Sequence, residues 1–83
     1  MYTSIPKITG PQLIRLLSLD GWEIRRKARH GLVLRKRIAG RLFRTVVSTR
    51  PEPLPEGTLS AILRQTGLGK EGLLRLLNKH GLK

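Results

Sequence analysis

Residues 22–48 combine strand-forming residue types with a high density of positive charge, and this combination limits the possible folds most strongly. Val, Ile, Phe and Thr, which favour strands, recur through the stretch. Ten of the seventeen Lys and Arg residues lie between Arg25 and Arg50, and Glu23 is the only acid in residues 22–48. Because so much charge is rarely buried, we expect a basic sheet that keeps one charged face free in solvent.

Three strands are expected in this stretch. Trp22 and Ile24 alternate with polar residues, which is typical of a short strand with one buried face. Residues 32–34 continue as a second strand, and residues 42–48 form a third. Ala39-Gly40 marks the turn between the last two. Strands joined by so short a turn are antiparallel, so we predict a three-stranded meander.

A helix before the sheet is predicted over residues 11–20, where Leu and Ile recur at helical spacing. Thr9 precedes it as an N-cap, and Gln12 stands where it completes a capping box. Gly21 supplies a left-handed residue after the helix, and Trp22 follows where a Schellman motif places its hydrophobic contact.

Two more helices are predicted after the sheet. Residues 50–57 contain three prolines, which make this connector unsuitable for a regular helix or strand. Apolar spacing then predicts helices at residues 57–66 and 70–80, each followed by a glycine. We therefore expect one domain over residues 1–83 with the order α-β-β-β-α-α. This is an α+β two-layer sandwich, with helices on one face of a three-stranded antiparallel sheet.

The net charge of +12 on 83 residues predicts an anionic partner. Membrane binding would need a basic amphipathic helix with aromatic anchors, whereas Tyr, Trp and Phe each occur once here. We therefore expect nucleic acid as the partner and no membrane, and an acidic protein partner stays open as an alternative. The chain has no cysteine, which excludes disulfides and suits a reducing cytoplasm. Without a secretory pattern or an apolar run of about 20 residues, we expect a soluble, cytoplasmic protein.

Several kinds of chemistry are excluded by the residues present. The sequence has no Cys/His metal spacing and no glycine-rich phosphate loop, and it lacks paired acids for metal-assisted or glycosidic hydrolysis. We therefore expect no metal site and no small-molecule cofactor.

Several stretches in order resemble the HicA family of bacterial and archaeal toxins, also called YcfA-like. IPKITGPQLIRLLSLDGW, residues 5–22, is similar to that family's opening helix and the aromatic residue that begins its first strand. LPEGTLSAILRQTGLGKEGLLRLL, residues 54–77, is similar to its closing segment. The spacing from Val46-Val47 to Pro51 also fits, and the resemblance covers roughly residues 5–79.

This resemblance implies a fold like a double-stranded-RNA-binding domain, α-β-β-β-α, here with an added C-terminal helix. It also implies a metal-independent endoribonuclease, an mRNA interferase, that cuts messenger RNA as the toxin of a type II toxin–antitoxin pair. The partner would be a HicB-type antitoxin protein, which covers the active histidine. His30 matches the family's histidine if one residue is deleted in the preceding loop, and Ala28-Arg29 stands where Gly-Ser is usual. The family's Pro and His after the third strand correspond to Ser48 and Arg50.

His30 is the candidate catalytic residue. Cleavage without a metal requires removal of a proton from a ribose 2′-hydroxyl, stabilisation of charge on phosphorus, and protonation of the leaving oxygen. Histidine titrates near neutral pH and suits the first or last task. Guanidinium groups suit the second, and Arg26, Arg29 and Arg35 are close in sequence. The alternative is that His30 is a polar residue at the end of a strand, without a chemical role.

The position of His30 in the second strand raises a question of direction. Counted by strand parity, His30 shares a face with Leu32 and Leu34, which should face the helices. We therefore predict a bulge at Gly31 that turns the imidazole towards solvent. His80, by contrast, is expected to stabilise the C-terminus of the last helix.

The cations of the predicted sheet are the candidate RNA-binding residues. Arg25, Arg35, Arg37 and Arg44 alternate with apolar neighbours and are expected to line one face, whereas Phe43 is expected in the core. The full set is Arg25, Arg26, Lys27, Arg29, Arg35, Lys36, Arg37, Arg41 and Arg44. Two alternatives to the toxin stay open: a non-catalytic RNA-binding module of the same fold, and a small chromosomal or ribosomal protein.

Overall fold

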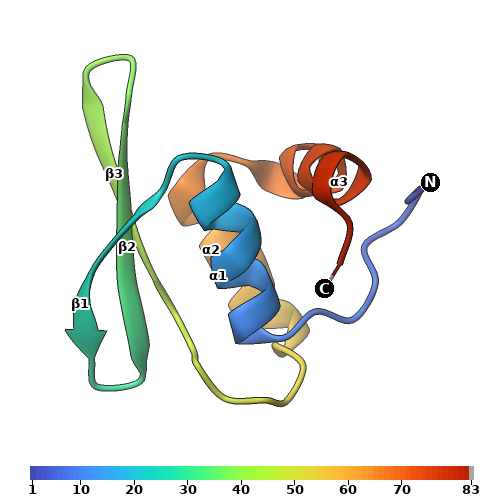
Figure 1. Cartoon of the computed structure of the whole chain (residues 1–83), viewed down its shortest axis with the longest axis horizontal. Helices are drawn as coiled ribbons and strands as arrows, with labels where there is room; N and C mark the ends of the chain where they lie inside the picture. Colours follow the sequence, from blue (N-terminus) through green and yellow to red (C-terminus); the bar gives the residue numbers. More distant parts are fainter. Residues whose placement is uncertain (83) are drawn as a thin grey trace.

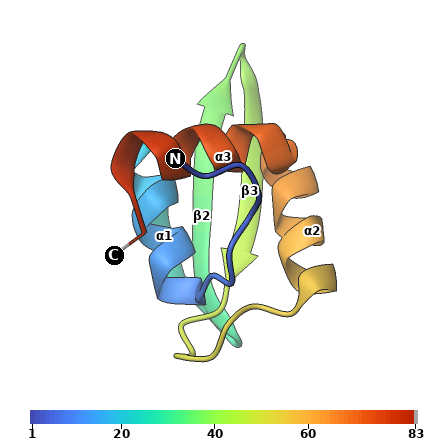
Figure 2. The ribbon, with the colours of Figure 1, turned by 90° about the vertical axis from the view of Figure 1, so that its right-hand side faces the viewer.

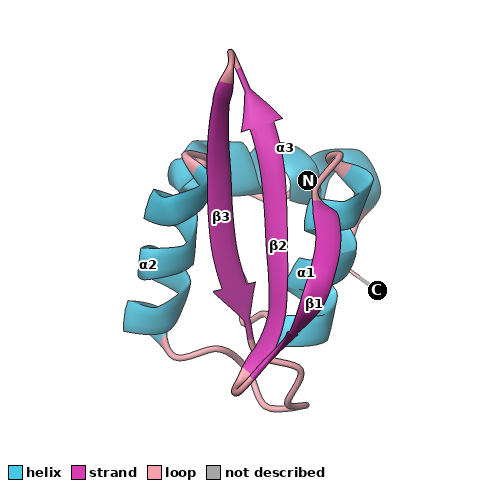
Figure 3. Cartoon of the chain, turned by 90° about the vertical axis from the view of Figure 1, so that its left-hand side faces the viewer, coloured by secondary structure: helices cyan, strands magenta, loops and turns pink. Residues whose placement is uncertain are grey.

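The structure, a computed structural model, describes residues 1–82, and its elements follow the predicted order α-β-β-β-α-α. They are α1 (Gly10–Leu19), β1 (Glu23–Ala28), β2 (Gly31–Ile38), β3 (Arg41–Val47), α2 (Glu56–Thr66) and α3 (Gly69–His80). The strands form one antiparallel sheet in the order β1-β2-β3. All three helices lie on one side of this sheet (Figure 1) and leave its other face open (Figure 3). The predicted α+β two-layer sandwich is confirmed.

Both ends of α1 are held as the sequence predicts. The Thr9 hydroxyl accepts a hydrogen bond from the backbone N–H of Gln12 at 3.2 Å, and the Gln12 side chain accepts one from the N–H of Thr9 at 2.9 Å. At the other end, Gly21 has a φ of 95°, and the N–H of Trp22 donates to the carbonyl of Leu17 at 3.0 Å. This Schellman-type ending turns Trp22 into the core, where it is buried.

Helices α2 and α3 each begin one residue before their predicted starts. Gly67 ends α2 in the left-handed conformation, with a φ of 74°. The N–H of Leu68 then donates to the Thr66 hydroxyl at 3.4 Å, so α2 does not repeat the backbone ending of α1. The residues that end the helices were thus predicted correctly, while the hydrogen bonding at the end of α2 differs from that at the end of α1.

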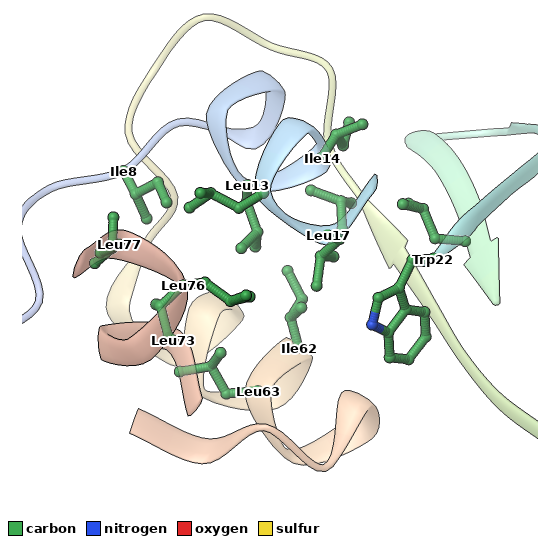
Figure 4. Packing of buried hydrophobic residues seen from close by; sticks show 13 residues of the cluster. Ile8, Leu13, Ile14, Leu17, Trp22, Ile62, Leu63, Leu73, Leu76 and Leu77 are labelled. Carbon is green, nitrogen blue, oxygen red and sulfur yellow. The ribbon is translucent and has the colours of Figure 1, made fainter. Parts of the chain in front are cut away.

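The hydrophobic core joins the three helices to the covered face of the sheet. Side chains of α1, α2 and α3 point toward one another in Figure 4, and α3 crosses the other two helices on the side away from the sheet (Figure 2). The sheet contributes Leu34 and Val47 to this cluster, and both are fully buried. The buried cluster is Ile8, Leu13, Ile14, Leu16, Leu17, Trp22, Leu34, Val47, Ile62, Leu63, Leu73, Leu76 and Leu77.

Strand β1 differs from its prediction in length and in burial. It continues to Ala28, and its pairing with β2 shifts between Ile24 and Arg26, which leaves Arg25 as a bulge. Ile24 is 50% exposed although its partner across the strands, Leu34, is fully buried. The expected burial therefore holds for Trp22, which precedes β1, but not for Ile24, because the main helix contacts are made by α1 and α2 with β3, at the opposite edge of the sheet.

The turn between β2 and β3 is the predicted one. Ile38 and Arg41 are the last pair of the ladder, so Ala39 and Gly40 alone form the turn. Their φ angles of 51° and 79° are both left-handed, as in a type I′ turn. This hairpin projects beyond the helices (Figures 1 and 3).

Candidate nucleic-acid interface

His30 lies in the two-residue turn that joins β1 to β2. Ala28 and Gly31 are paired, so Arg29 and His30 make the turn, and both are exposed. His30 was predicted near the start of the second strand, and it directly precedes that strand, which begins at Gly31. The predicted bulge at Gly31 is wrong, because the irregular pairing falls at Arg25. Strand parity therefore does not direct the His30 side chain, because a turn residue is outside the ladder. The imidazole is available to a ligand.

Two glycines hold the end of β3 beside this turn. A β-carbon on Gly31 would stand 2.1 Å from the carbonyl oxygen of Val47, and one on Gly10 would stand 1.6 Å from the carbonyl oxygen of Ser48. Neither position has room for a side chain. The backbone at the end of β3 is thus packed between the start of β2 and the start of α1, and the residues that follow come next to His30.

A pocket of about 440 Å³ lies where β2 begins and β3 ends, and His30 lines it. Among the described residues, its lining includes cations and hydroxyl groups but no Asp or Glu. The polar lining residues besides His30 are Lys27, Arg29, Ser48, Thr49 and Arg50. Guanidinium, ammonium and hydroxyl groups all donate hydrogen bonds, so this lining is suited to a phosphate.

The segment after β3 supplies the part of this pocket that sequence reasoning missed. Ser48, Thr49 and Arg50 were not among the predicted site residues, although they line the pocket with His30. The Ser48 hydroxyl accepts a hydrogen bond from the backbone N–H of Arg50 at 3.1 Å, which fixes the bend of this segment. Two signals in the sequence pointed to this segment: Arg50 is the last of the ten clustered cations, and Ser48 and Arg50 correspond to the Pro and His that the resembled family has after its third strand.

The open face of the sheet carries four of the predicted RNA-binding arginines. Strand pairing and alternation place Arg35, Arg37 and Arg44 on this face, as predicted, and Arg26 of β1 joins them. Arg35 and Arg44 are direct partners across β2 and β3. On its other side Arg35 is paired with Glu23, whose carboxylate accepts a hydrogen bond from the Arg35 Nε at 3.2 Å.

Five predicted RNA-binding residues do not join this face. Two of them, Lys27 and Arg29, line the His30 pocket. Arg25 is the bulged residue of β1 and has no partner in the ladder. Lys36 lies on the helix side, where its ammonium group donates to the backbone carbonyl of Asp20 and lies 3.4 Å from the Asp20 carboxylate. Arg41 is also on that side, with its guanidinium carbon 5.4 Å from the centroid of the Phe43 ring. Phe43 packs against the core, as expected.

His80 is the last residue of α3 and follows Lys79 there. Its position in the last turn is as predicted, and its expected interaction with the helix dipole stays a prediction. Within residues 1–82, no three His, Asp or Glu side chains lie close enough together to hold a metal ion. In the same part of the chain, no helix has the length and apolar character that crossing a membrane requires.

No protein-family model, curated protein or solved structure matches this chain. The resemblance to the HicA family therefore stays a prediction from the sequence.

Proposed function

We propose that the chain is a HicA-like endoribonuclease that binds messenger RNA on its basic sheet and cuts it at His30. One observation carries the proposal: the exposed imidazole of His30 shares a pocket with Arg29, Arg50 and Ser48, at the end of an open sheet face that carries arginines. A nuclease needs a group that exchanges protons next to donors that hold a phosphate, and this pocket combines both.

In the proposed reaction, the imidazole of His30 accepts the proton of a ribose 2′-hydroxyl while the 2′ oxygen attacks the adjacent phosphorus. The guanidinium groups of Arg29 and Arg50 stabilise the negative charge that develops on the phosphoryl oxygens. The bond from phosphorus to the 5′ oxygen then breaks. The imidazolium of His30, or water, returns a proton to that oxygen, which leaves a 2′,3′-cyclic phosphate and a free 5′-hydroxyl.

The same proposal includes a partner and a location. A HicB-type antitoxin with an acidic surface would complement the net charge of +12 and cover the exposed His30 turn. Both proteins would act in the cytoplasm, where messenger RNA is available. A short neighbouring reading frame whose product co-purifies with this chain and blocks RNA cleavage would support the pairing.

A non-catalytic RNA-binding module is the second candidate, and the composition of the pocket favours it. In the part of the chain that the structure describes, His30 is the only histidine of this pocket and no carboxylate lines it. One imidazole would have to act first as base and then as acid. If binding without cleavage is all that the arginine face does, the wild-type protein will hold RNA and leave it intact.

The deciding experiment compares wild type with His30→Ala on a single-stranded RNA in the presence of EDTA. General acid–base catalysis contributes about 10²–10⁴-fold, so we expect cleavage by His30→Ala to fall by a factor in that range while RNA binding is kept. His80→Ala is the matched control, because it removes the other histidine at the end of α3 and should cut at the wild-type rate. Equal cleavage by wild type and His30→Ala would refute the nuclease proposal, and binding by wild type without any cleavage would select the second candidate.

A further inference from the structure

We propose that Arg35 and Arg44 together clamp one phosphate of a single-stranded RNA whose scissile phosphate lies in the His30 pocket. The inference rests on the proposed function and adds to it the class of substrate and the path of the strand. The clamp joins β2 to β3, and the pocket lies farther along the same two strands, where β2 begins and the segment after β3 passes beside it.

The pairing of Arg35 with Arg44 is unfavourable for the folded protein alone. Like charges directly opposite each other on antiparallel strands destabilise a sheet. Glu23 offsets only the charge of Arg35, and among residues 1–82 Arg44 takes part in no salt bridge. A phosphate between the two guanidinium groups would neutralise both, and guanidinium forks match the geometry of phosphate oxygens.

The surface between the clamp and the pocket is apolar. Val33 and Val46 are partners on the open face. They lie two residues along the strands from Arg35 and Arg44, which is the next position on the same face. Val46 is 45% exposed, and Val33 beneath its neighbours is 5% exposed. Arg26 is the partner of Val33 on β1 and edges this apolar row. A nucleic acid presents riboses and bases between its phosphates. An apolar row between two cationic positions therefore matches the alternation of phosphates with riboses and bases along the strand.

The spacing of these positions favours an extended single strand. Arg35 lies four residues after Gly31 along β2, which corresponds to about 13 Å at roughly 3.3 Å per residue. An unpaired strand can follow this short path and lay its sugars and bases on the exposed Val46. In a duplex the bases are paired and face inward, so only the charged backbone would contact the apolar row. An acidic protein would also be attracted to the arginines, and the binding experiment distinguishes this partner from a nucleic acid.

The test uses a single-stranded RNA with 2′-O-methyl groups at every position, which cannot be cut through its 2′ oxygens. Fluorescence polarisation at one fixed salt concentration compares wild type with Arg35→Ala, Arg44→Ala and the double variant. Hydrogen bonds to a charged group are worth about 1.5–3 kcal/mol, so each single variant should lose about tenfold or more in affinity. Because the two groups share one phosphate, the double variant should lose much less than the product of the two single losses.

The matched control is Arg64→Ala/Arg75→Ala, which removes two exposed arginines from α2 and α3 and changes the net charge equally. It should lose far less affinity than the clamp variant. A duplex of the same sequence should bind the clamp and control double variants equally. Equal losses in the two double variants on the single strand, as expected if the arginines serve an acidic protein, would overturn the clamp. Multiplicative losses would also overturn it, and a duplex that depends on the clamp would overturn the single-strand assignment.

This outcome is independent of catalysis, because the probe cannot be cleaved. A wild-type protein that binds the probe through the clamp but leaves ordinary RNA intact would refute the nuclease and leave the clamp in place. A protein that cuts ordinary RNA and whose clamp variants bind the probe as the control does would refute the clamp alone.

Discussion

The α-carbon of Gly31 lies so close to the backbone of Val47 that a β-carbon on residue 31 would stand 2.1 Å from the Val47 carbonyl oxygen. This contact joins the start of β2 to the end of β3, and it sets the position of the His30 turn relative to Ser48 and Arg50. The geometry of the His30 pocket therefore depends on a residue that has no side chain.

Gly31→Ala should destabilise the fold and reduce RNA cleavage together, because the added methyl group must push the two strands apart. We expect a loss of about 1–3 kcal/mol in the free energy of unfolding, measured by urea denaturation. Gly57→Ala is the control: nothing lies within 4 Å of that position, and alanine is the better helix former in α2. Unchanged stability and unchanged cleavage in Gly31→Ala would contradict the close contact.

Ala39→Gly should stabilise the protein. Ala39 has a φ of 51° in the turn of the projecting hairpin, and a left-handed conformation costs an L-residue roughly 1–2 kcal/mol. Glycine adopts it without that cost, although it also loses more chain entropy on folding, so we expect a net gain of about 0.5–1 kcal/mol. The same substitution at Ala61, inside α2, should lower stability by about 1 kcal/mol. Thermal unfolding of the two variants should shift in opposite directions.

Lys36→Met should weaken the fold but leave RNA binding nearly unchanged, in contrast to Arg35→Ala. The Lys36 ammonium group donates to the carbonyl of Asp20 on the helix side of the sheet, so its loss leaves the end of α1 without this bond. For a partly exposed group we expect a cost of about 1 kcal/mol. Chemical denaturation and RNA titration of the same preparations check both effects. A large loss of RNA affinity in Lys36→Met would show that the two faces have been assigned wrongly.

Arg44→Thr should stabilise the free protein while it weakens RNA binding. Removing one of two opposed guanidinium groups relieves a cross-strand repulsion worth roughly 0.2–1 kcal/mol, and threonine suits a strand. Glu23→Gln should have the opposite effect on stability, because it removes the carboxylate that offsets Arg35. The gain from Arg44→Thr should shrink at high salt, where the repulsion is screened. A destabilised Arg44→Thr variant at low salt would argue against the repulsion.

The sequence by itself determined the helices, their ends and the order of the strands, because these features depend on neighbouring residues. Thr9 and Gln12 are three residues apart, and their reciprocal hydrogen bonds need only one helical turn. Ala39-Gly40 likewise sets a two-residue turn, and alternation from that turn puts Arg35, Arg37 and Arg44 on one face.

Only the tertiary structure decided what surrounds His30. The chain around His30 does not reveal whether that residue begins a strand or occupies a turn, because the answer depends on how the bulge at Arg25 shifts β1 against β2. Nor does it reveal that Ser48 and Arg50 lie beside His30, since they come from the far end of another strand. That neighbourhood follows from long-range packing, in which Gly10 and Gly31 let the backbone of residues 47 and 48 approach α1 and β2.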